Sequence, residues 1–401
     1  MRSVMRNGES VKNLVRKNRK FYILMIILAL IPWFLEAYDS ELYFFASPYI
    51  INTLKISQSY IGITASVFAI GIAVFSMVGG YLFDKISPKY VIVSAVGLFT
   101  IFTILTGYVS NGIELVIYRF LVGVGVGIFQ PATAAFAGDL LNTTRALRIG
   151  ANSVAFGIGL FVAPYVISPF LPNFSLPFLI SGIMSIISLA LFFYFVPVNY
   201  REEVRERIDL RKIINLNTII LSIIILSFGI ALFAFLGYYS DYLLYGLNLS
   251  KSEATIIASM NGLGELAFLL PIALLSDKVS RKISLISSSM ILTLASIGLF
   301  IGYTGYLQMV LLTIAWGAGY GGLIVSVISF SQDIVPDEVV GSVTGFMFLT
   351  FNIGAIFGAP LMGLLIQSYG FEKAGLLAIA LPSFIALLLA VIIRHKNGKK
   401  D

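Results

Sequence analysis

The sequence has 401 residues, contains no cysteine and has a single histidine, His395. The missing cysteines exclude disulfide bonds and thiolate metal sites. A single imidazole also excludes the two-histidine zinc motifs, so we expect neither a bound metal nor a cofactor. Charged residues are scarce as well, at 12% of the chain, whereas a soluble domain carries roughly 25%. This scarcity leaves too few polar side chains to cover a fold in water.

Long apolar segments take the place of the missing charge, because 58% of the residues are hydrophobic. A helix needs about 20 apolar residues to cross the hydrocarbon core of a bilayer. The sequence predicts twelve such helices. The expected spans are residues 21–44, 59–82, 89–110, 113–137, 149–170, 176–197, 216–240, 253–275, 282–304, 307–330, 342–366 and 373–393. The fold class we expect is therefore all-α and integral to a membrane.

A polar stretch divides these helices into two sets of six. It runs from Asn199 to Asn215 and carries five Lys and Arg residues among acids. We therefore predict a bundle over residues 1–198, a cytoplasmic linker over 199–215 and a second bundle over 216–401. With the N-terminus in the cytoplasm, 23 of the 27 Lys and Arg residues fall in segments that face the cytoplasm. Such loops are enriched in Lys and Arg, so both termini are expected there, and the net charge of +7 indicates topology rather than a nucleic-acid partner.

Two loops repeat one motif at an offset of 193 residues. The first reads GYLFDKISPK over residues 80–89, and the second reads ALLSDKVSRK over residues 273–282. A second echo pairs residues 156–163 with residues 351–358. Repeated sets of helices are typical of secondary transporters. The sequence therefore predicts two parallel bundles of six helices each.

Both loops resemble the cytoplasmic signature loop of the major facilitator superfamily, and each follows the second helix of its half. The resemblance implies a transporter that works by alternating access, with motifs nearest to those of sugar or metabolite proton symporters. It also implies that the charged loop residues close the cytoplasmic side, although some of the cations could serve only as anchors at the membrane surface. These residues are Asp84, Lys85, Lys89, Asp277, Lys278, Arg281 and Lys282.

A further pair of loops resembles the acid-then-arginine loop of sugar-porter-like members of that family. The first copy carries Asp139 and Arg145, and the second carries Asp333 with Val340 where an arginine is expected. We therefore expect a weaker ion-pair network on the cytoplasmic side of the second half. The same charges could alternatively be solvated loop residues.

Four ionisable residues are expected inside the membrane. A charge there costs about 2.5–3.5 kcal/mol on insertion scales, so its presence points to function. Glu36 and Asp39 share one face of the first helix, in a segment that resembles the DGxD motif of proton-coupled symporters. Arg119 precedes a run of glycines in the fourth helix, and its depth predicts an ion pair with Glu36 or Asp39. Glu265 lies near the middle of the eighth helix. We predict that these four residues couple transport to protons.

Neutral polar and aromatic residues at mid-depth are candidates for the solute site. Each could instead serve helix packing. The candidates are Gln130, Asn261, Trp316, Asn352 and Tyr238.

We therefore expect a monomeric, multi-pass transporter of the plasma membrane rather than an enzyme. Its partners are a small solute such as a sugar or organic acid, protons and the lipid bilayer. Symport with protons is the main prediction. The fifth helix carries part of an antiporter signature, Gly150, Gly159 and Ala163-Pro164, which leaves proton-coupled efflux as an alternative. A transporter-like sensor is the third possibility.

Overall fold

The computed structural model describes residues 19–140, 145–196, 213–302, 305–336 and 339–393, and every regular element in this part of the chain is helical. Lipid offers no hydrogen bonds to the backbone, so a helix satisfies each spanning segment internally. The first group of helices comprises α2 (Arg19–Leu54), α3 (Ser59–Lys85), α4 (Pro88–Thr106), α5 (Gly112–Leu140), α6 (Arg145–Ile167) and α7 (Ser175–Phe195). The second comprises α8 (Leu216–Asp241), α9 (Lys251–Lys278), α10 (Arg281–Phe300), α11 (Tyr306–Asp333), α12 (Val340–Gly375) and α13 (Leu381–Ile392).

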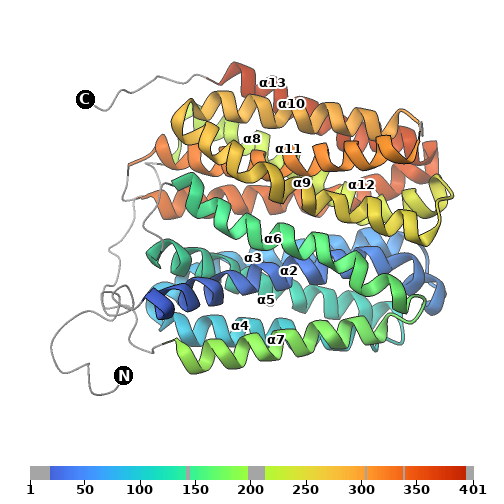
Figure 1. The fold of residues 1–401 in the computed structure, drawn as a ribbon, viewed down its shortest axis with the longest axis horizontal. Coiled ribbons are helices and arrows are strands. Elements are labelled where there is room, and N and C mark those ends of the chain that lie inside the picture. The colour runs from blue at the N-terminus through green and yellow to red at the C-terminus, as the bar shows by residue number, and fades with distance from the viewer. Residues whose placement is uncertain (1–18, 141–144, 197–212, 303–304, 337–338, 394–401) are drawn as a thin grey trace.

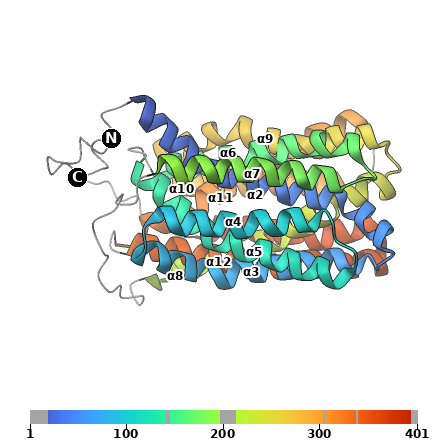
Figure 2. The ribbon, with the colours of Figure 1, turned by 90° about the horizontal axis from the view of Figure 1, so that it is seen from below.

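The two groups lie side by side, with α2 to α7 in the lower part of Figure 1 and α8 to α13 in the upper part. Short π-helical turns, η4 (Tyr242–Gly246) and η6 (Leu376–Ala380), adjoin α8 and α13. The long helices run along one common axis in both views (Figures 1 and 2). The start of α2 and the end of α13 lie at the same end of the bundle. We call this the near end and the opposite one the far end.

Eleven segments of the described residues are long and apolar enough to cross a membrane. The last segment, Ser342–Ile392, has 51 residues, which would extend about 76 Å as one straight helix. It is interrupted at Gly370, where φ is 76° and ψ is 172°. The two helices expected at 342–366 and 373–393 are therefore joined here by a sharp break without an intervening loop. The expected all-helical membrane fold is present. The number of separate described segments is eleven rather than twelve, because the last two expected helices form one continuous segment.

The sequence echo between residues 156–163 and 351–358 corresponds to one packing role used twice. Gly159 of α6 lies so close to α2 that an added Cβ would stand 2.5 Å from the carbonyl oxygen of Phe34. Gly354 of α12 faces α8 in the same way, and a Cβ there would meet the carbonyl oxygen of Leu226. Small residues let helix backbones approach closely in membranes.

The two groups meet along α3 with α12 and along α6 with α9. At the far end this boundary is closed by hydrogen bonds between side chains. Gln58 donates to Asp241 at 2.6 Å, and the hydroxyl of Thr255 bonds that of Ser168 at 2.8 Å. Asp241 is only 2% exposed. The carboxylate at the end of α8 therefore lies buried between the groups.

Candidate functional site

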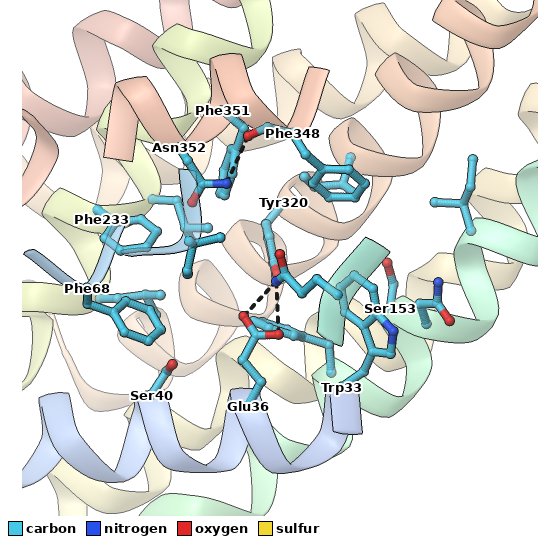
Figure 3. A pocket seen from close by; sticks show the side chains of 18 of the residues that line it. Trp33, Glu36, Ser40, Phe68, Ser153, Phe233, Tyr320, Phe348, Phe351 and Asn352 are labelled. Atoms are coloured by element: carbon cyan, nitrogen blue, oxygen red, sulfur yellow. Dashed lines mark hydrogen bonds between the residues drawn. The ribbon is translucent and has the colours of Figure 1, made fainter. Parts of the chain in front are cut away.

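A cavity lies between the two helix groups and takes its walls from both. Its volume is about 80 Å³, which is below the roughly 300–1,000 Å³ of sites that enclose a drug-sized ligand. Helices α2, α3, α5 and α6 supply one side, and α8, α11 and α12 supply the other. The residues labelled in Figure 3 converge on this space, and they are Trp33, Glu36, Ser40, Phe68, Ser153, Phe233, Tyr320, Phe348, Phe351 and Asn352.

Glu36 is the one charged side chain among the described residues that line the cavity. It projects from α2, and both of its carboxylate oxygens accept hydrogen bonds from Nε2 of Gln130 on α5, at 2.8 and 2.9 Å (Figure 3). The amide of Gln130 thus fixes the position of the carboxylate. Glu36 is only 5% exposed, so a solute in the cavity would meet it with little intervening water.

An ion pair lies beside the cavity and outside its lining. Nη1 of Arg119 donates to Oδ2 of Asp39 at 2.8 Å, and both side chains are 1% exposed. The guanidinium lies 4.3 Å from the ring centre of Tyr43 and 4.9 Å from that of Phe68. Phe68 also lines the cavity. The sequence left the partner of Arg119 open between two acids, and the structure pairs it with Asp39, one turn of α2 beyond Glu36.

This ion pair is not fully hydrogen-bonded. Oδ1 of Asp39 and both Nε and Nη2 of Arg119 are buried without a hydrogen-bond partner. Unsatisfied buried polar atoms are costly, and each is a candidate for a second arrangement of the site or for contact with water.

Asn352 supplies a free acceptor from the second group. Its Nδ2 donates to the carbonyl oxygen of Phe348 at 2.8 Å, which fixes the orientation of the amide. Its Oδ1 is buried without a partner and is directed toward the cavity (Figure 3). The side chains of Gln130 and Asn352, both expected at mid-depth from the sequence, therefore both border the cavity.

Four other predicted residues lie away from the cavity. Glu265 of α9 is 1% exposed and faces α6, where a Cβ on Gly157 would stand 3.1 Å from its Oε2. Trp316 is stacked on Phe235 with ring centres 3.7 Å apart, inside the second group. The last two, Asn261 and Tyr238, are buried at 2% and 1% exposure and do not line the cavity.

The near-end loop of the second group contains a bridged set of charges. Arg281 contacts Asp277 at 2.5 Å and Asp333 at 2.6 Å. Arg281 of the signature loop thus supplies Asp333 with the cation that Val340 does not. A weaker network than in the first half stays a prediction, because the charged side chains of the corresponding loop in the first half lie outside the described part of the structure. In the other loop, Lys89 lies 4.4 Å from the ring centre of Phe193.

Four predicted loop side chains lie outside the described part of the structure, and two others form no ion pair with a described residue. The first set is Asp84, Lys85, Asp139 and Arg145. The second is Lys278 and Lys282. Within the described residues, no group of three His, Asp or Glu side chains could hold a metal ion.

Five aromatic residues of the lining were not predicted from the sequence. Trp33, Phe68, Phe233, Phe348 and Phe351 all face the cavity. In a membrane protein an aromatic residue on a helix has the same hydropathy whether it faces lipid, a neighbouring helix or a cavity. The one signal in the sequence is proximity, since Trp33 precedes Glu36 by three residues and Phe351 directly precedes Asn352.

The chain was compared with known proteins. The family model for the Major Facilitator Superfamily matches residues 23–246 and 221–401. The hexuronate transporter of Bacillus subtilis is 27% identical over 387 residues, covering 88% of this chain and 90% of that protein. Multidrug resistance protein 1 of the same species is 25% identical over 328 residues, covering 80% and 84%.

Partial and structural matches agree with these. A 4-hydroxybenzoate transporter of Acinetobacter baylyi is 26% identical over 185 residues, covering 45% of this chain and 40% of that protein. The crystal structure of the nucleoside transporter NupG superposes with a TM-score of 0.74 at 17% identity, covering 92% of this chain and 98% of that one. This last match concerns the fold alone.

Proposed function

Because the chain belongs to the major facilitator superfamily, it is a multi-pass transporter of the plasma membrane and not an enzyme, and we propose that it carries a small organic solute together with protons. The solute binds in the central cavity. Alternating access opens this cavity first to one side of the membrane and then to the other. The observation that carries this proposal is the buried pair of Asp39 and Arg119 next to the cavity.

The proposed topology has twelve crossings in two halves, residues 1–198 and 216–401, with a linker between them. The segment Ser342–Ile392 counts as two crossings, because its length exceeds twice a hydrocarbon core of about 30 Å and its helix breaks at Gly370. An even number of crossings places both chain ends on one side. The excess of Lys and Arg in the segments on that side supports the cytoplasm.

Proton coupling is supported by the arrangement of the buried pair. A proton on Asp39 would neutralise the carboxylate and release the guanidinium of Arg119, which already has two nitrogen atoms without partners. Movement of either group would disturb Phe68, whose ring contacts Arg119 and lines the cavity. Protonation and solute binding would thus act on the same side chains, as coupling requires.

Symport is favoured because the proposed proton site and the cavity are separate. Asp39 does not line the cavity, so a proton and a solute can be bound together. Efflux by antiport is the second candidate, since Glu36 does line the cavity and a proton there would compete with the solute. One proton moving through 100 mV supplies about 2.3 kcal/mol, enough for a concentration ratio between tenfold and a hundredfold.

The test uses purified protein in liposomes that contain a pH-sensitive dye. A panel of hexuronates, hydroxybenzoates, nucleosides and aromatic amines is added to one side at zero membrane potential. Symport predicts that a transported solute carries protons in with it, and antiport predicts that protons move the opposite way. Asp39→Asn should abolish the proton movement while leaving solute exchange between equal compartments. Solute uptake without proton movement in either direction would contradict the proposal.

A further inference from the structure

We infer that the central cavity selects solutes that carry a cationic nitrogen, such as a protonated amine, next to an aromatic or apolar group. This inference rests on the proposed function only in taking the cavity as the solute site. It specifies a chemical class different from the organic acids named for two of the relatives.

The first observation is the sign of the charge in the cavity wall. Glu36 is the one ionisable acid or base among the described lining residues, and its neighbour Gln130 adds no charge. The nearest described cation, Arg119, is already bonded to Asp39 and covered by the rings of Tyr43 and Phe68. An anionic solute would therefore lose its water next to a carboxylate and gain no free cation.

The buried interior as a whole has the same bias. Arg119 is the one basic side chain among the buried described residues, whereas five acidic side chains are buried there. These acids are Glu36, Asp39, Glu41, Asp241 and Glu265. When these carboxyl groups are deprotonated, the potential in the cavity favours a positive ligand over a negative one.

The second observation is that each wall offers the ligand an acceptor, although the lining also holds a free donor, Nε1 of Trp33. The carboxylate oxygens of Glu36 each accept one bond from Gln130 and have further lone pairs. Oδ1 of Asn352, from the opposite wall, accepts none. An ammonium group carries three N–H donors and no acceptor, so it can satisfy atoms on both walls at once. A carboxylate has only acceptors and would leave Oδ1 of Asn352 unsatisfied.

The third observation is the ring of aromatic side chains around these acceptors. Trp33 and Phe348 lie with ring centres 6.4 Å apart, and Phe68 and Phe233 face each other across the helix groups at 6.5 Å. Aromatic faces attract a cation within about 6 Å, most strongly when water is excluded. They also bury the apolar part of an aromatic solute. Carboxylate and rings together fit an arylalkylamine.

The experiment measures equilibrium binding to the purified full chain in detergent. The chain has two tryptophans, and only Trp33 lines the cavity, so Trp316→Phe leaves Trp33 as the fluorescent reporter. The probes are benzylamine, benzyl alcohol and benzoate, which share one ring and differ in charge. We expect benzylamine to bind at least tenfold more tightly than benzoate. Calorimetry with the unsubstituted chain checks that the reporter background binds alike.

The variants test the role of the carboxylate. Glu36→Gln should weaken benzylamine binding at least tenfold and leave benzyl alcohol binding unchanged. Glu41→Gln removes another buried acid of the same helix that does not line the cavity, and it should leave both unchanged. Asn352→Ala should weaken benzylamine binding by a smaller factor, and it provides a second test if Glu36→Gln does not fold.

The inference is overturned if benzoate binds as tightly as benzylamine, if no probe binds up to its solubility limit, or if Glu36→Gln and Asn352→Ala both leave benzylamine binding unchanged. Binding at equilibrium does not depend on proton coupling. Amine binding without proton movement in liposomes would therefore contradict the proposed function alone, and proton-coupled transport of acids without amine binding would contradict this inference alone.

Discussion

The ring centre of Phe68 lies 4.9 Å from the guanidinium carbon of Arg119, and the same ring forms part of the cavity wall. Phe68 is thus the described side chain in contact with both the buried ion pair and the space where we place the solute. Phe68 also faces Phe233, which belongs to the second helix group and lies on the opposite wall of the cavity. Separation of the two groups at these rings would expose the ion pair to water in the cavity.

Phe68→Ala is expected to expose the ion pair of Asp39 and Arg119 permanently to water in the cavity. Protons should then cross liposome membranes in the absence of any solute, several times faster than with the unsubstituted chain, as measured with an internal pH-sensitive dye. Phe99→Ala is the matched control, because Phe99 is buried against Phe129 within the first group and does not line the cavity. Equal proton leak from both variants would show that the effect is a general loss of packing.

The pairing of Asp39 with Arg119 predicts a specific pattern of stability. Arg119→Leu leaves the carboxylate of Asp39 buried without a cation, and losing one partner of a buried pair costs about 3–5 kcal/mol. Asp39→Asn added to Arg119→Leu removes the stranded charge and should restore much of the melting temperature in detergent. If the double variant melts as low as the sum of the two single effects, the residues do not interact energetically.

The hydrogen bond from Gln58 to Asp241 predicts how the far end opens. Because the chain contains no cysteine, Ser40→Cys places a single reactive thiol in the cavity wall. A membrane-impermeant thiosulfonate added from the far side should label it several times faster once Gln58→Ala is introduced. Asn52→Ala is the control, since its bond to Tyr245 is 3.5 Å long and exposed. Identical labelling rates in all three proteins would mean that the Gln58 bond does not hold the far end closed.

Two glycines of α12 predict opposite effects of the same substitution. Gly354→Ala places a methyl group against the carbonyl oxygen of Leu226 in α8, and such overpacking costs about 1–3 kcal/mol. Gly345 has open space around it, so Gly345→Ala should leave stability unchanged or raise it by up to about 1 kcal/mol through helix propensity. Thermal unfolding in detergent compares the two. A similar melting temperature for both variants would contradict the close contact of α8 and α12.

The partners of the charged residues could be predicted only in part. The sequence indicates that Arg119 needs an acid on the first helix, since an unpaired guanidinium in lipid is costly. It cannot separate Glu36 from Asp39, which lie about one turn apart at similar depth. In the structure Arg119 forms an ion pair with Asp39, and Glu36 accepts a hydrogen bond from Gln130. Likewise, Arg281 reaches Asp333 from another helix, a contact that motif spacing within one loop does not reveal.

The sequence by itself determined that the chain folds in a membrane and which family it belongs to. Three features of the sequence carry this information: apolar runs of membrane length, the bias of Lys and Arg, and two signature loops 193 residues apart. Each is a pattern of neighbouring residues, so it can be recognised without a structure. The tertiary structure alone decided which helix faces meet. It brought Trp33, Phe233 and Phe348 to one cavity, because hydropathy is the same for a side chain facing lipid and for one facing a binding site, and only the packing of the helices separates the two.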